Sequence, residues 1–339
     1  MRAVIMLLAA SALAMSVEPR LRVEVLQSTG GLPAHIAGSF REPLGFQQTE
    51  AGRYYVFDRR GHTVYTVDPQ ADAPRKLAEI GAEAGRLLDP SAFDLDPTDG
   101  SFAVADAPGR QERVQIFTAT ASRLGGFWLP EKNVPRLTLG NLVLNGVGSL
   151  QYTGRTLLLN QPGSGSLVTE YAFDGSIVRT FGNLRQTGHE AERDLHVAFN
   201  IGLPIVNPAG GYYFVFQSGV PVFRKYDAKG TLLFERHVEG PEIDQYLREM
   251  PTVWPRQRTA EGDIIPLVPP AVRTAGADRR GNLWISLTVP FTYVYDPSGD
   301  KLRTVQFKGA DVLSPNSLSF TKDGRVLVTP GCYEFRPGD

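Results

Sequence analysis

One short phrase recurs along this 339-residue chain: a few polar residues, a glycine, and then a run that alternates around aromatic and β-branched residues. Alternation with a period of two indicates a β-strand, and a glycine after polar residues indicates a tight turn. The phrase therefore predicts a hairpin that is repeated from end to end of the chain. Its copies are TEAGRYYVFD, PTDGSFAVAD, QYTGRTLLLN, NPAGGYYFVF, DRRGNLWISL and TKDGRVLVTP, with their turn glycines at Gly52, Gly100, Gly154, Gly210, Gly281 and Gly324.

Each copy continues in a similar way, which extends the hairpin to a four-stranded unit. A second alternating run ends in an aspartate or a turn, as in HTVYTVDPQ and FTYVYDPSGD, and a further strand follows, as in TLLFERHV. Repeats of this length built from short antiparallel strands are typical of β-propeller blades. Six copies predict an all-β, six-bladed propeller of four-stranded antiparallel blades. Because the last copy lacks a fourth strand, we expect the N-terminal strand Leu21–Ser28 to complete it and close the ring.

The domain organisation follows from the same pattern. We expect residues 20–339 to form a single propeller with an insertion at about 240–270, where the interval between turn glycines is longest. Within it, Ile243, Tyr246 and Leu247 have helical spacing after an acidic start. Long loops on a rigid scaffold are often functional, so we expect this insertion to shape one rim of the ring.

The N-terminus has the composition of an export signal. Arg2 precedes an apolar run from Ala3 to Ala14 that ends in a small-x-small pattern, which predicts a signal peptide over residues 1–14 and a secreted or periplasmic protein. The alternative is a buried first strand or helix. The run is too short to anchor the chain in a bilayer, and no later apolar stretch is long enough. The 35 basic and 36 acidic residues nearly cancel, so a nucleic acid partner is not expected.

In a propeller, the loops that lead into each innermost strand and the loops between the second and third strands lie on one face around the central axis. Polar groups that converge in a concavity hold ligands, so we expect a protein, peptide or glycan partner to bind there. The expected ligand-binding residues are Arg41, Glu42, Asp89, Asn145, His196, Asn200, Arg273 and Asn316. The loops between second and third strands add Arg59, Arg60, His62, Gln161 and Gln217.

Catalytic signatures are sparse. The five histidines form no HxH or HExxH pair, and no Gly-x-Ser-x-Gly, Walker or dinucleotide motif is present, so no organic cofactor is expected and no catalytic residue is assigned. His196 is the one histidine to test as a general base, against the simpler interpretation of a half-buried structural residue. Asp58 and Asp106 are expected to accept hydrogen bonds from turn amides and hold the next loop.

Tyr54–Asp68 and Ser101–Phe117 resemble the NHL repeat, in which a strand ending in Ala-Asp, a glycine-containing turn and a strand ending in Phe-Asp follow one another. The resemblance implies a six-bladed propeller, but it leaves function open, since such propellers bind proteins, RNA or sugars and some are enzymes. Pro315–Thr329 also resembles gluconolactonase and paraoxonase-type propellers, although Ser317 stands where that motif has glycine.

The second resemblance implies an alternative function, that of a metal-dependent lactonase, esterase-like hydrolase or lyase. Its cation would be calcium, which prefers several hard oxygen ligands. Such an enzyme is expected to bring Glu42 and at least two of Asn145, Asn200 and Asn316 around one point. A binding module needs no such convergence, and polar side chains that hydrate a channel explain these residues better than a calcium site does.

Overall fold

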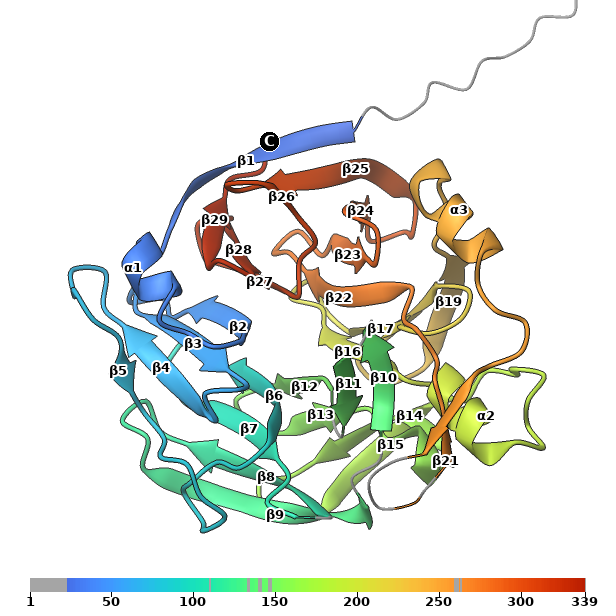
Figure 1. The fold of residues 1–339 in the computed structure, drawn as a ribbon, viewed down its shortest axis with the longest axis horizontal. Helices are drawn as coiled ribbons and strands as arrows, with labels where there is room; N and C mark the ends of the chain where they lie inside the picture. Colours follow the sequence, from blue (N-terminus) through green and yellow to red (C-terminus); the bar gives the residue numbers. More distant parts are fainter. Residues whose placement is uncertain are drawn as a thin grey trace, which may run out of the picture.

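The computed structural model describes residues 23–338 apart from 110, 133–134, 140–141, 146–147, 259–261 and 263. The signal expected over residues 1–14 and the first two residues of the expected N-terminal strand lie outside the described part. The described chain is built mainly of short strands, and its sheets are arranged in a ring (Figure 1).

Four separate sheets of four antiparallel strands make up one side of this ring. The first sheet contains β2 (Pro43–Gln48), β3 (Tyr54–Asp58), β4 (Thr63–Val67) and β5 (Arg75–Lys76). The second contains β6 (Pro90–Leu95), β7 (Phe102–Asp106), β8 (Gln111–Phe117) and β9 (Arg123–Lys132). The third contains β12 (Leu150–Tyr152), β13 (Leu157–Leu159), β14 (Ser166–Tyr171) and β15 (Ile177–Asn183). The fourth contains β16 (Gly202–Val206), β17 (Tyr212–Phe216), β18 (Val222–Tyr226) and β19 (Leu232–His237).

The strands on the other side of the ring share one nine-stranded sheet, so the separate four-stranded sheets number four and not the expected six. The cause is β1 (Val23–Gly31), which pairs in parallel with β25 through Val23–Gln27 and antiparallel with β29 from Ser28 onward. Sequence reasoning expected the second pairing and missed the first. The other strands are β22 (Val272–Ala277), β23 (Leu283–Leu287), β24 (Thr292–Tyr295), β25 (Lys301–Lys308), β26 (Val312–Leu313), β27 (Ser317–Phe320), β28 (Val326–Thr329) and β29 (Tyr333–Phe335).

The repeated glycine phrase forms the hairpin that the sequence predicts. All six turn glycines lie between the first and second strands of a unit, with φ from 76° at Gly100 to 110° at Gly210. At Gly281, φ is 81° and a Cβ atom would also lie 2.8 Å from the Cβ of Ala209. Both the backbone conformation and the space therefore favour glycine there.

The first strands surround the middle of the ring. β2, β6, β12, β16, β22 and β27 contact one another in that order, and β27 contacts β2. Three polar side chains on these strands accept a backbone N–H from the next first strand, which links the strands sideways. They are Gln47, Asp94 and Gln151, and the donors are Leu95, Tyr152 and Val206 at 3.0, 2.7 and 3.2 Å.

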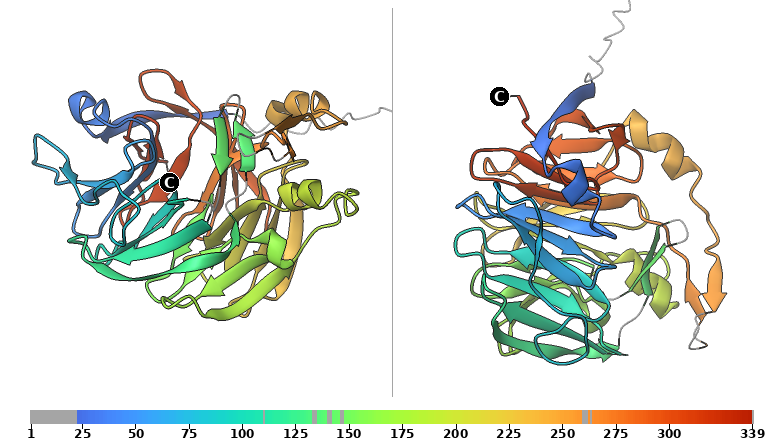
Figure 2. Two further views of the ribbon diagram at one scale, coloured as in Figure 1. Left: turned by 60° about the horizontal axis from the view of Figure 1, so that its bottom comes forward. Right: turned by 60° about the vertical axis from the view of Figure 1, so that its left-hand side comes forward.

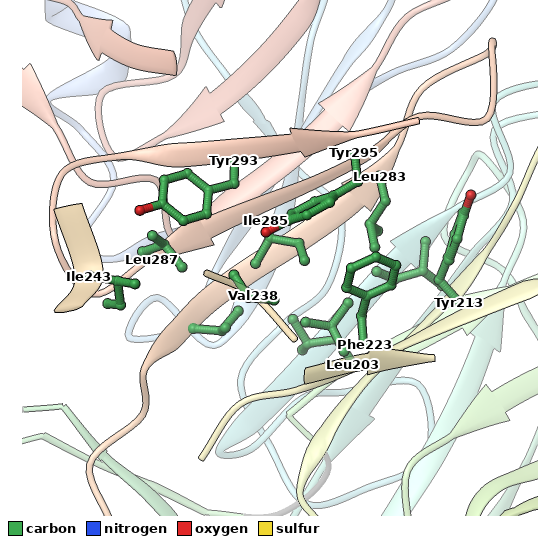
Figure 3. Packing of buried hydrophobic residues seen from close by; sticks show 13 residues of the cluster. Leu203, Tyr213, Phe223, Val238, Ile243, Leu283, Ile285, Leu287, Tyr293 and Tyr295 are labelled. Carbon is green, nitrogen blue, oxygen red and sulfur yellow. The ribbon is translucent and has the colours of Figure 1, made fainter. Parts of the chain in front are cut away.

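The core lies between neighbouring sheets. In the largest cluster, Tyr213 and Phe223 of one sheet pack against Ile285 and Tyr295 of the next (Figure 3). Ile243 of helix α3 (Pro241–Arg248) belongs to the same cluster, so the helix expected in the long insertion is anchored to the ring. Burial of such side chains contributes roughly 1.5–3 kcal/mol each.

The remaining elements lie in the connections between units, except η1 (Pro162–Ser164), which lies between β13 and β14 of the third sheet. The others are α1 (Ala34–Ala37), the hairpin β10 (Pro135–Leu139) and β11 (Leu142–Asn145), α2 (Arg193–Phe199), and the hairpin β20 (Arg256–Arg258) and β21 (Ile264–Pro266). Figure 2 shows β10–β11, α2 and β20–β21 standing out from the same side of the ring. None of the helices in the described residues has the length and apolar character needed to cross a membrane.

Candidate functional site

Backbone hydrogen bonds place two sets of loops on one face of the ring. In four units, the loop that leads into the first strand is bonded to the loop between the second and third strands of the same sheet. Examples are Ala107 to Leu88 at 3.0 Å, Gln217 to Ile201 at 3.0 Å and Thr288 to Ala271 at 2.9 Å. We call this side the loop face, and the opposite side, which carries the other connections, the turn face.

The two faces differ in how much chain they carry. On the turn face every connection is a tight turn, from residues 153–156 at the shortest to 68–74 at the longest. The segments that lead into first strands are longer, from 309–316 to 184–201 and 238–271, and they contain all three helices and both extra hairpins. Long loops on a rigid scaffold carry function far more often than tight turns do.

Charged residues of the first unit form one cluster on the loop face. Arg59 makes a bidentate pair with Glu42, with Nε and Nη2 at 3.0 and 2.9 Å from its two oxygens, and Arg60 Nε lies 3.4 Å from the same carboxylate. Asp58 holds the loop through the backbone N–H groups of Arg41 and Glu42, both at 2.8 Å, as the sequence predicts. The Arg41 side chain is exposed. Glu42 is therefore already neutralised by two arginines.

Asp106 holds the connection that leads into its own sheet, whereas the sequence predicts that it holds the next loop. Its carboxylate accepts a hydrogen bond from the backbone N–H of Leu88 at 3.0 Å and a bidentate pair from Arg113 at 2.8 and 2.9 Å. Arg113 also donates to the carbonyl oxygens of Ala82 and Arg86. The buried ion pair between Arg113 and Asp106 thus holds the connection over residues 77–89 in place.

His62 and Asp89 meet between the first and second units. The backbone N–H of Asp89 donates to His62 Nδ1 at 2.9 Å, and His62 Nε2 lies 3.9 Å from Asp89 Oδ1. Since Nδ1 accepts, the neutral ring carries its proton on Nε2, on the side of the carboxylate. Both residues have left-handed backbones, with φ of 51° and 49°. Non-glycine residues in this conformation are strained and gather at functional sites.

His196 and Asn200 lie on and just after α2, where they hold that segment together. His196 Nδ1 is 2.8 Å from the Thr187 hydroxyl, and 3.9 Å from Glu190 Oε1. Asn200 is fully buried, accepts the backbone N–H of Arg185 at 2.8 Å and donates to the carbonyl oxygen of His196 at 2.9 Å. Both ends of the Asn200 amide are thus bonded within the fold.

Arg273 and Asn316 are brought together by neighbouring first strands. Arg273 Nη1 donates to Asn316 Oδ1 at 2.8 Å, while Gln217 Nε2 donates to the Arg273 carbonyl oxygen at 3.2 Å. Arg273 Nε is buried and has no hydrogen-bond partner in the described structure. Burial lowers the pKa of Arg273, because the charged form loses its hydration.

Gln161 and Asn145 are two further residues that the sequence predicts for this face. Gln161 is buried and accepts a hydrogen bond from the Tyr171 hydroxyl, so it is used in packing. The backbone of Asn145 ends β11, whose hairpin lies over the middle of the ring in Figure 1, but its side chain lies outside the described part.

The expected calcium ligands have no hydrogen-bond or ion-pair partner in common. Glu42, Asn200 and Asn316 are bonded to arginines or to backbone atoms in different units, as given above. No group of three or more His, Cys, Asp or Glu side chains that could hold a metal ion is found within the described ranges.

Sequence reasoning missed the polar chain on the first strands. Asp94 accepts hydrogen bonds from Gln47 Nε2 at 2.9 Å and from the backbone N–H of Tyr152 at 2.7 Å. Burial raises the pKa of Asp94 to about 6, against these hydrogen bonds, which lower it. The signal in the sequence is a lone carboxylate in PSAFDL, at the fifth residue of an otherwise largely apolar strand.

The chain was compared with known proteins. No protein-family model matches it, and no curated protein matches it. Among solved structures it is similar to catalytically inactive virginiamycin B lyase from Staphylococcus aureus with quinupristin, at 10% identity over 87% of this chain and 93% of that one, with a TM-score of 0.52. The selenomethionine form of that lyase has 9% identity over 85% and 77%, with a TM-score of 0.51.

A chain in the mitotic checkpoint complex is similar over 100% of this chain and 99% of its own length, at 9% identity and a TM-score of 0.51. At these identities the likeness shows the fold alone. The chain is a β-propeller.

Proposed function

We propose that this protein is an exported six-bladed β-propeller that acts as a binding module, with a protein, peptide or glycan bound on its loop face. The blade count is supported by the six first strands that contact one another in a ring and by the six glycine turns. In this interpretation the nine-stranded sheet consists of two blades. One contains β22–β25 and the other contains β27–β29 and β1, and the parallel pairing of β1 with β25 joins the two blades.

The observation that carries the binding role is the difference between the two faces. Connections on the turn face are short everywhere, whereas the loop face carries helices, two extra hairpins and the insertion over 238–271. A scaffold that needed only stability would not require long segments on one side alone. The similar propellers include a lyase solved with quinupristin and a chain of a multiprotein complex, so both small molecules and proteins are plausible ligand classes for this architecture.

The test blocks one face at a time. Cys332 is buried and its pKa is raised by burial to about 12, so it does not compete for a thiol reagent. Val253→Cys places a thiol on the insertion of the loop face, at a residue that is 82% exposed, and Lys229→Cys places one in an exposed turn of the other face. Each variant is coupled to a polyethylene glycol maleimide and applied to glycan and peptide arrays.

We expect the label at position 253 to abolish the array signals and the label at position 229 to leave them intact. Equal signals from both labelled proteins would overturn the assignment of the loop face. Export is tested separately by the intact mass of the secreted protein, which is expected to lack residues 1–14.

The metal-dependent lactonase, esterase-like hydrolase or lyase remains the second candidate. The observation that favours it is the strained His62–Asp89 pair on the loop face, which has the groups for proton transfer. A ligand that binds only the folded protein raises its melting temperature, so melting is compared with chelator, with added Ca²⁺ and in Glu42→Gln. The binding module predicts no calcium shift. A shift that Glu42→Gln removes, together with turnover of lactones or esters, would establish the enzyme instead.

A further inference from the structure

Arg273 differs from the other arginines that the fold buries. Arg113 uses its guanidinium on a carboxylate and two carbonyl oxygens, and Arg185 donates to the carbonyl oxygens of Phe199, Ser218 and Val220. Arg273 has a single side-chain hydrogen bond, to Asn316, and takes part in no ion pair with any residue that the structure describes. Its Nη1 is occupied, while Nε and Nη2 have no hydrogen-bond partner among the residues that the structure describes.

The backbone puts this guanidinium in a special position. The pairing of β22 with β23 shifts register between Val272 and Thr274, so Arg273 is the extra residue of a β-bulge. The same shift surrounds Leu44 in β2 and Ser91 in β6. A bulge redirects one side chain out of the regular alternation and is common beside binding sites. The bulge is thus shared by three of the first strands, and of these β22 alone carries a charged residue at the bulge.

The electrostatics of the position are those of one isolated cation. Burial is the sole cause that lowers the pKa of Arg273, and no neighbouring charge offsets or adds to it. A guanidinium that is partly desolvated without a counter-ion is unfavourable unless a ligand supplies the charge. Nε is buried from solvent, so the donor left for a ligand is Nη2, and a carboxylate is an anion with which a guanidinium makes short, charge-assisted hydrogen bonds. A single positive charge matches a carboxylate better than a phosphate dianion.

Resting on the proposed binding role of the loop face, we propose that Arg273 binds a carboxylate group of the ligand through Nη2, with Asn316 holding the guanidinium in place. The carboxylate belongs either to an acidic sugar or to a peptide C-terminus. Asn316 acts here as a positioning residue, since its amide oxygen fixes Nη1 at 2.8 Å.

The experiment measures melting temperature and calorimetric binding with matched pairs of small probes at millimolar concentration. Glucuronate is compared with glucose, and acetyl-glycylglycine with its C-terminal amide, so that the two sources of the carboxylate are separated. We expect at least one acid to raise the melting temperature while its neutral counterpart does not. Arg273→Gln is expected to weaken that acid by about tenfold or more, as the loss of a charge-assisted pair implies.

Two further variants test whether an effect of Arg273→Gln arises only because that variant fails to fold. Asn316→Asp gives Arg273 an internal carboxylate, so it is expected to raise the melting temperature of the free protein and to weaken the acid. Arg248→Gln removes the same charge from an exposed position on α3 and is expected to bind the acid like the wild type. The proposal is overturned if neither acid binds the wild type, or if Arg273→Gln or Asn316→Asp binds it unchanged. If the label at position 253 still blocks the array signals in that case, the assignment of the binding site to the loop face remains valid.

Discussion

Arg113 and Arg273 carry the same charge close to the loop face, yet their surroundings are opposite. The Arg113 side chain is 7% exposed and pairs with Asp106, whose side chain is 0% exposed. Its remaining donors reach the carbonyl oxygens of Ala82 and Arg86. Arg273 has one neutral partner, Asn316, and a buried Nε without any.

The difference separates a structural charge from a candidate binding charge. All three guanidinium nitrogens of Arg113 donate hydrogen bonds inside the fold, so its charge stabilises the connection over residues 77–89. Arg273 retains Nη2 for a ligand. Incomplete hydrogen bonding of a half-buried polar group is rare in native proteins and calls for an explanation, most often a missing ligand or water.

The largest expected effect comes from removing the satisfied charge. Arg113→Met leaves the Asp106 carboxylate buried with only the Leu88 and Gln115 hydrogen bonds, and it releases the loop that Arg113 holds. We expect the free energy of unfolding in urea to fall by about 3–5 kcal/mol. Arg53→Ala is the matched control, because its pair with Asp68 is solvent-exposed and is expected to contribute less than about 1 kcal/mol. Similar losses in the two variants would contradict the comparison.

Asp94 extends the comparison to an anion whose partners are all neutral. Its pKa is about 6 in the folded protein against a usual 3.8, so between these values the folded state holds a proton that the unfolded state has released. The free energy of unfolding therefore falls as the pH rises from about 4 to about 6, by about 2–3 kcal/mol from this group, and it is level above that.

The variant Asp94→Asn cannot titrate and is expected to lose this contribution. Urea unfolding of wild type and variant at pH 4.5 and pH 7 isolates it, because the other carboxylates are common to both proteins. If the difference between the two proteins is the same at both pH values, the raised pKa of Asp94 is wrong.

The repeat pattern predicted the architecture because it depends on local chemistry. Each turn glycine precedes an alternating strand, and both are encoded within about ten residues. Asp58 was assigned correctly for the same reason, since it accepts the backbone N–H of Gly61 in the turn that follows its strand, at 3.0 Å. The backbone N–H that Asp106 accepts comes instead from Leu88, on the far side of the hairpin β6–β7. The parallel pairing of β1 with β25 joins residues 281 apart, such as Val23 and Thr304, and no local pattern encodes it.

The site was predictable only as a set of loops. Arg273 and Asn316 were expected at the axis and do contact each other, whereas Asn200 was expected there and is instead buried beneath α2. The difference lies in the hydrogen-bond partners of each side chain, and these partners come together only when the chain folds. Asp94 was missed because its meaning depends on Gln47 and Tyr152, which come from two other units.

A smaller effect is expected at the candidate binding charge. Arg273→Met removes the hydrogen bond to Asn316, but it also removes a buried donor without a partner and a desolvated charge without a counter-ion. These contributions oppose each other, so we expect the free energy of unfolding to change by no more than about 1 kcal/mol in either direction. A loss near that of Arg113→Met would show that Arg273 is a structural residue and would remove the distinction drawn between the two arginines.

The smallest effect is expected at an ion pair that is exposed on the loop face itself. Arg256 Nη2 lies 2.5 Å from Glu192 Oε2 and links β20 to the segment just before α2, but the two side chains are 40% and 52% exposed. Water and salt screen such a pair, and ordering two long side chains offsets most of its attraction. Glu192→Gln is therefore expected to lower the free energy of unfolding by less than about 0.5 kcal/mol, measured in urea at low and high salt. The packing of Trp254 against Phe199, with ring centroids 5.1 Å apart, should hold the insertion to α2 without the ion pair. A loss above about 1 kcal/mol that disappears in high salt would mean that charge, and not this aromatic contact, attaches the insertion to the ring.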